Sequence, residues 1–143
     1  MAPSRDCRSL NCIRMKLLPT QTDEAALLHF GREVVSLIER RDFQSLADRF
    51  GYALAGEKKG PVIAIQEDFQ GCIAKFRASS EQRPPVLPSM VVKYFKPNSA
   101  NLVAVVECVF GAPEGCPILA ELIVSLAGED KYVTLEEISL ARV

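Results

Sequence analysis

The side chains best suited to proton transfer lie in the C-terminal part of this sequence. Glu136 and Glu137 interrupt its last apolar stretch, and Tyr94 and Tyr132 lie in stretches of the same kind. A carboxyl group enclosed by apolar side chains has a raised pKa, so it can act as an acid or a base near neutral pH. Glu136 with Tyr94 or Tyr132 is therefore the candidate catalytic set, and the sequence places no orienting partner beside it.

The remaining reactive residues do not form a set. His29 is the single histidine and lies beside the apolar stripe of a predicted helix, where a packing or solvent-facing role is the default. The five cysteines are an odd number without a secretory signal, which favours free thiols in the reducing cytoplasm. Cys7 and Cys12 have no second close pair or histidine cluster to complete a zinc site. We therefore expect no metal and no cofactor.

Length and charge limit the other function classes. The chain has 143 residues and a formal charge of −1, which favours one domain and no general attraction for nucleic acid. No apolar run approaches the roughly 18 residues of a membrane-spanning helix, so no membrane partner is expected. Residues 1–20 are basic and irregular and predict a disordered leader before a single domain over residues 21–143.

Three helices are predicted in the first half of the chain. Asp23 and Glu24 form a start signal before an apolar stripe of helical spacing, and Asp42 can cap a shorter helix. Pro61 suits the first position of a third helix. Residues 51–55 could either continue the second helix or form a short edge strand.

From Ser89 onward the apolar period changes to two, which is typical of strands. The predicted strands, joined by short turns that force antiparallel neighbours, are Ser89–Phe95, Leu102–Phe110, Pro117–Leu126 and Lys131–Ala141. In the last of them the apolar alternation changes phase across Glu136 and Glu137, which predicts a β-bulge. Helices followed by an antiparallel meander predict an α+β fold.

This order of elements, over Thr22–Val143, resembles the nuclear transport factor 2-like, cystatin-like α+β cone. The resemblance implies three N-terminal helices packed on a curved, mainly antiparallel sheet of four or five strands. Isomerase-like and cyclase-like members of that superfamily use carboxylates, sometimes with a tyrosine, inside the cone. The segments Arg49–Ala55 and Ala64–Phe69 are also similar to small uncharacterised bacterial proteins, some of them carried on mobile gene cassettes.

The two faces of the predicted sheet differ in composition. One face of each long hairpin strand carries no acid or base beyond a thiol, and we expect the helices to cover it. The other face combines aliphatic side chains with Glu107 and Glu121, which lie opposite each other if the hairpin is tight, and with Lys93, which can compensate them. Monomers seldom expose a large apolar patch, so this face predicts a homodimer interface. Its residues are Val103, Val105, Glu107, Leu119, Glu121 and Ile123.

These observations leave two hypotheses for function. The first is a non-catalytic module that forms a homodimer or holds a small apolar ligand. The second is a small isomerase-type or cyclase-type enzyme that uses Glu136 with a tyrosine. An open cavity lined by Glu136 and a tyrosine would favour the enzyme, and a filled core would favour the module.

Overall fold

The computed structural model describes residues 15–55, 59–79, 85–112 and 115–142. In chain order the elements are β1 (Met15–Lys16), the 3-10 turn η2 (Pro19–Gln21), α1 (Glu24–Glu39), α2 (Phe43–Phe50), α3 (Gly60–Ser79), β2 (Ser89–Tyr94), β3 (Leu102–Gly111), β4 (Pro117–Ala127) and β5 (Asp130–Leu140). The predicted α+β fold is confirmed, as three helices packed against a five-stranded antiparallel sheet that does not close into a barrel.

The helix starts follow the predicted caps. The Asp23 carboxylate accepts a hydrogen bond from the backbone N–H of Ala26 at 2.8 Å, and the Asp42 carboxylate accepts one from Ser45 at 3.1 Å. Each of these bonds satisfies a backbone donor that the first helical turn leaves without a partner. The third helix begins at Gly60, one residue before the proline that suits its first turn.

The sheet has the strand order β1-β5-β4-β3-β2, and every neighbouring pair is antiparallel. Each of the four predicted strands is confirmed to within one residue at both ends. The short strand β1 pairs Met15 with Val133 and Lys16 with Tyr132, so the folded part of the chain includes residues before position 21. The rest of the predicted leader, residues 1–14, lies outside the described residues.

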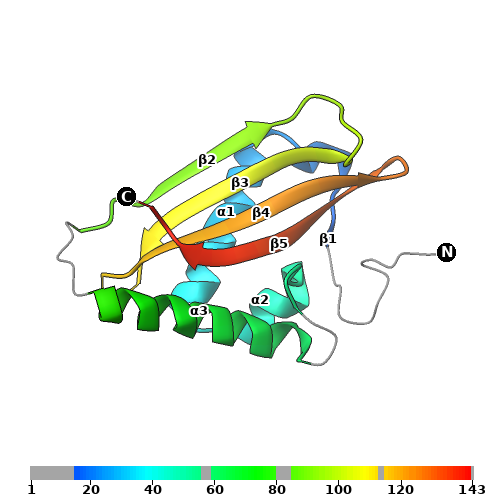
Figure 1. Cartoon of the computed structure of the whole chain (residues 1–143). Helices are drawn as coiled ribbons and strands as arrows, with labels where there is room; N and C mark the ends of the chain where they lie inside the picture. Colours follow the sequence, from blue (N-terminus) through cyan, green and yellow to red (C-terminus); the bar gives the residue numbers. More distant parts are fainter. Residues whose placement is uncertain (1–14, 56–58, 80–84, 113–114, 143) are drawn as a thin grey trace.

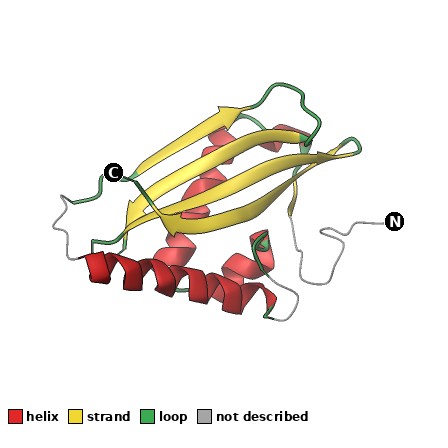
Figure 2. Ribbon diagram, viewed as in Figure 1, coloured by secondary structure: helices red, strands yellow, loops and turns green. Residues whose placement is uncertain are grey.

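All three helices lie on one side of the sheet. Figure 1 looks onto the opposite side, with α1 passing behind the strands and α3 running below β5. Helix α1 contacts β2, β3 and β4, whereas α2 and α3 contact β5. Figure 2 shows the same two-layer arrangement, with the helices beneath one face and loops at the sheet ends. In the described chain, no helix or strand covers the other face.

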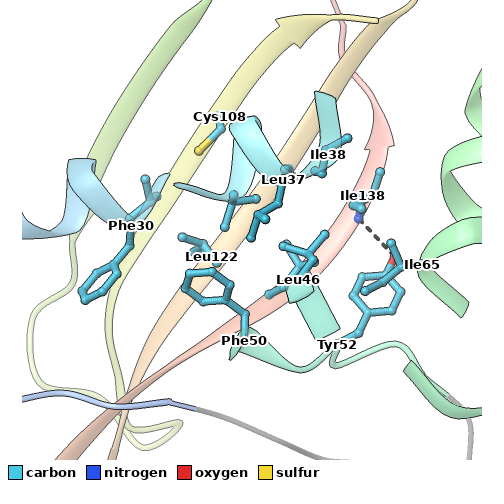
Figure 3. Close-up of a cluster of buried hydrophobic side chains, with 14 of the residues drawn as sticks. Phe30, Leu37, Ile38, Leu46, Phe50, Tyr52, Ile65, Cys108, Leu122 and Ile138 are labelled. Carbon is cyan, nitrogen blue, oxygen red and sulfur yellow. Dashed lines mark hydrogen bonds between the residues drawn. The ribbon is translucent and has the colours of Figure 1, made fainter. Parts of the chain in front are cut away.

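The face that carries no acid or base forms the core with the helices, as predicted. Side chains from β3, β4 and β5, such as Cys108, Leu122 and Ile138, interleave with Phe30 and Leu46 from the helices (Figure 3). The core residues are between 0% and 7% exposed, so the space between the layers is filled with side chains.

Gly31 brings α1 directly onto the sheet. A Cβ atom at this position would lie 2.6 Å from Met90 Sδ and 3.0 Å from Cys108 Sγ. Ordinary carbon contacts are near 3.5–4.0 Å, so only glycine allows the helix to approach this closely without a shift of its neighbours.

Two predicted local features are refined by the structure. The sequence alternation places Leu102 on the core face and Val103 on the outer face. A register shift lies between Leu102 and Ala104, however, and Val103 packs against the core. Residues 51–55 form neither helix nor strand, because Gly51 ends α2 at φ 68° and the chain then runs along β5. There the backbone N–H of Ala53 donates a hydrogen bond of 2.9 Å to the carbonyl of Leu135.

Candidate functional site: the outer face of the sheet

The candidate site is the side of β2–β5 that faces away from the helices, called the outer face below. Its apolar part is made of half-buried or exposed aliphatic side chains from three neighbouring strands: Val91, Val109, Leu119 and Ile123. Val105, at the centre, is only 6% exposed although no element of the described chain covers it. Neighbouring side chains of the same sheet surface therefore already shield it.

Three glutamates cross this face side by side. Glu107 of β3 pairs with Glu121 of β4, which pairs with Glu137 of β5. We call these three residues the glutamate row. Side chains that lie directly opposite on antiparallel strands have Cβ atoms about 4.5–5.5 Å apart, and like charges in that relation destabilise the sheet. The predicted opposition of Glu107 and Glu121 is confirmed, and Glu137 extends it by one strand.

One lysine compensates part of this charge. Lys93 of β2 forms an ion pair with Glu107, with Nζ 3.0 Å from Oε1. In the described residues, no lysine or arginine forms such an ion pair with Glu121 or Glu137. Partial burial, followed by the charges of Glu107 and Glu137, raises the pKa of Glu121 above its ordinary value. Glu121, in the middle of the row, therefore has a carboxylate neighbour on each side and no ion-pair partner in the described residues.

The predicted β-bulge decides which glutamate joins the row. Glu121 pairs with Glu137 and Leu122 pairs with Leu135, so Glu136 is the additional residue of β5. This shift lets both Leu135 and Ile138 reach the core while Glu137 points to the outer face. The phase change in the sequence predicts the bulge, but Glu137 was missed as a member of the row because either of the two glutamates could be the extra residue.

The structure does not bring the catalytic candidates together. Tyr94 is at the β2 edge, 51% exposed, and its hydroxyl donates to the backbone carbonyl of Thr22 at 3.1 Å. Glu136 lies three strands away on β5. Tyr132 is four residues before it in the same strand, opposite Ser125. A proton-transfer site needs its groups within hydrogen-bond reach of one substrate, and this separation does not provide that.

Two hollows border Glu137. One, of about 500 Å³, lies over the glutamate row between aliphatic side chains and extends to Arg142. The other, of about 270 Å³, lies between α3 and β5 and is lined by Asp68 and Cys72. Neither is lined by Glu136 or by Tyr94 or Tyr132. Both are open surface features rather than a chamber inside the fold.

The described thiols are structural. Cys72, Cys108 and Cys116 are buried, as the strand and helix patterns predict for the first two. Burial raises the pKa of Cys72 to about 11 and that of Cys108 to about 12, so both are thiols at neutral pH and poor nucleophiles. His29 is exposed on α1, beside Phe30 at a ring distance of 6.4 Å, in keeping with a solvent-facing role.

The part of the chain that the structure describes contains no group of three or more histidine, cysteine or acidic side chains arranged to hold a metal ion. In the same residues, no helix is both long and apolar enough to cross a bilayer. Comparison of the chain with protein-family models, curated proteins and solved structures found no match. The resemblance to the nuclear transport factor 2-like cone and to cassette-encoded bacterial proteins therefore stays a prediction.

Proposed function

We propose that this protein is a non-catalytic association module that forms a homodimer through the outer face of its sheet. The observation that carries the proposal is the aliphatic outer face, which no element of the described chain covers while every helix packs on the other side. Contiguous apolar patches on soluble proteins commonly mark association sites. Since most soluble oligomers are symmetric homodimers, a second copy is the simplest occupant.

The size of the outer face supports a dimer. Four strands at about 4.8 Å spacing, three of them about 34 Å long, present roughly 600 Å² per protomer. Two such faces would bury roughly 1,200 Å² in total if their strands were nearly aligned and roughly 800 Å² if the strands crossed steeply, which is the size of weak, reversible interfaces. Such interfaces are typically apolar at the centre and polar at the rim, so the glutamate row that crosses this face requires compensation when a partner covers it.

The filled core favours association over the binding of an apolar ligand and over catalysis. Leu122, Leu135 and Phe50 are 0% exposed between the sheet and the helices, which leaves the fold interior to protein side chains rather than to an apolar ligand. The separation of Glu136 from both tyrosines gives the enzyme hypothesis no support from the geometry, which is a second reason to prefer association. The buried thiols agree with the cytoplasmic location that we propose for the module.

The proposal is tested by a matched pair of substitutions. Ile123 is half-buried at the centre of the outer face, and Ile63 is 45% exposed on α3, on the helical side of the molecule. Ile123→Asp should convert the dimer to a monomer in size-exclusion chromatography with light scattering, because it places a charge in a desolvated patch. Ile63→Asp makes the same chemical change and should leave the dimer intact.

Thermal melting followed by circular dichroism confirms that each variant is folded, and Leu119→Asp serves as a second outer-face variant. Val105 is a poorer choice because its 6% exposure means that a charge there would also disturb the monomer. Dimers that survive both outer-face substitutions in folded protein would refute the proposed interface.

A further inference from the structure

The charges on the outer face indicate how two copies would meet. Resting on the dimer proposed above, we infer that Lys93 of each protomer contacts the partner's Glu121 across the two-fold axis. Lys93 and Glu121 both lie on the outer face, and the vector between them in the sheet fixes how the two copies are oriented.

The need for such a contact follows from desolvation. A carboxylate that loses its water in an interface without gaining a cation imposes a large free-energy cost on association. Glu121 lies in the middle of the glutamate row, flanked by Glu107 and Glu137, and has no ion-pair partner in the described chain. A second copy that covers this face must therefore supply a positive group to Glu121 or pay that cost.

Lys93 is the cation best placed to supply the charge. It lies on the outer face itself, in the β2 position opposite Val105. Its side chain is 58% exposed even though it contacts Glu107. The ammonium group can therefore donate to a second carboxylate, one that belongs to a partner protomer. Arg142 follows the end of β5 and lines the hollow over the glutamate row, but it lies outside the paired strands, so the sheet register does not fix its position.

The sheet register gives the orientation. Lys93 and Glu121 are two strands and two residues apart, which is roughly 12 Å along the sheet surface at ordinary strand spacing and rise. A two-fold axis that exchanges these positions passes midway between them, at right angles to the line that joins them. The strands of the two sheets then cross at roughly 70°, close to the orthogonal class of sheet packing.

This orientation also satisfies the apolar centre. Val105 and Ile123 are paired across β3 and β4, in the row next to the glutamate row. The same axis places Val105 of one copy over Ile123 of the other, so aliphatic side chains meet aliphatic side chains around the axis. The two-fold symmetry produces the Lys93–Glu121 contact twice, on either side of this centre.

The test is a charge exchange between two variants, measured by sedimentation velocity. Lys93→Glu and Glu121→Lys should each weaken the homodimer by about thirtyfold or more, since each turns two attractive contacts into repulsive ones. Mixing the two variants in equal amounts should restore dimers, because a mixed pair has one original contact and one exchanged contact, both attractive. Lys75→Glu is the matched control. Lys75 is an exposed residue of α3, on the helical side of the molecule, so this change should leave the dimer unchanged.

The outcomes separate this inference from the proposed dimer. The Lys93–Glu121 contact is overturned if the two variants stay monomeric on mixing, or if each alone dimerises as well as the unmodified protein. In either case the outer-face dimer still stands if Ile123→Asp converts the unmodified dimer to a monomer. An unmodified protein that is monomeric overturns the dimer itself. If Lys93→Glu does not fold, because it also breaks the pair with Glu107, Lys93→Met replaces it. This variant should form a weaker homodimer, and mixing it with Glu121→Lys should restore dimers only in part, because the mixed pair keeps one original contact and loses the other.

Discussion

Replacing Tyr52 by phenylalanine should lower stability more than any other removal of a single oxygen atom in the described chain. Tyr52 is 2% exposed and joins the helical layer to β5. Its hydroxyl donates a hydrogen bond of 2.5 Å to Asp68 Oδ2 on α3 and accepts one of 3.2 Å from the backbone N–H of Ile138 (Figure 3). Ile138 lies beside the bulge and is paired with Ala120 of β4. On the other side of β5, the short strand β1 pairs only with Tyr132 and Val133, so the Tyr52 hydroxyl takes the place of a strand partner for the Ile138 N–H.

The size of the effect follows from these two bonds. Leaving the buried N–H of Ile138 without an acceptor costs about 1–3 kcal/mol, and a hydrogen bond to a charged group is worth about 1.5–3 kcal/mol. Asp68 lines the hollow between α3 and β5, so water can replace part of its lost bond. We therefore expect a loss of about 2–3 kcal/mol, which corresponds to a fall in melting temperature of roughly 6–10 °C.

Urea unfolding followed by circular dichroism measures this change. Tyr94→Phe is the matched control. The Tyr94 hydroxyl likewise bonds a backbone group, here the carbonyl of Thr22, but its side chain is 51% exposed, so its loss should cost less than about 1 kcal/mol. A Tyr52→Phe variant within 0.5 kcal/mol of the unmodified protein, or no more affected than Tyr94→Phe, would refute the role assigned to this bridge.

Three further substitutions or reactions test other parts of the structure. Because its surroundings raise the pKa of Glu121, the ionised form is disfavoured by folding, so Glu121→Gln should stabilise the monomer at pH 7.5 by roughly 0.2–1 kcal/mol in urea unfolding. That gain should vanish near pH 4, where the carboxyl group is protonated in the unfolded chain too; an equal gain at both pH values would argue against a charge effect. Gly31→Val should destabilise the fold by about 1–3 kcal/mol in urea unfolding, because the new Cβ would lie 2.6 Å from Met90 Sδ. An unchanged free energy of unfolding would mean that α1 does not approach the sheet this closely. In a chain whose Cys7 and Cys12 are replaced by serine, the three described thiols should resist a disulfide reagent at pH 8 and react only after unfolding, and rapid labelling of the folded chain would contradict their burial.

Much of the fold could be predicted because its signals are local. Asp23 and Asp42 mark their helices by side chains that bond to the backbone three residues on, and alternating side chains define the strands. The bulge near Glu136 was also predictable, since an extra residue leaves a visible change of phase.

What the sequence does not predict depends on register or on distant partners. Whether Glu136 or Glu137 is the extra residue depends on pairing with β4, and so does the membership of the glutamate row. The bonds of Tyr52 join residues 16 and 86 positions away, which no local pattern reports. The irregular pairing at Leu102 and Val103 has the same long-range origin.

The mass of the unmodified protein in solution tests the central claim most directly. The chain has a mass of 15.7 kDa. Sedimentation velocity over a concentration series up to about 100 µM should show a species of twice that mass, which dissociates on dilution, because an interface near the lower end of the stable range supports a reversible dimer. A single species at the mass of one chain throughout the series would contradict self-association through the outer face.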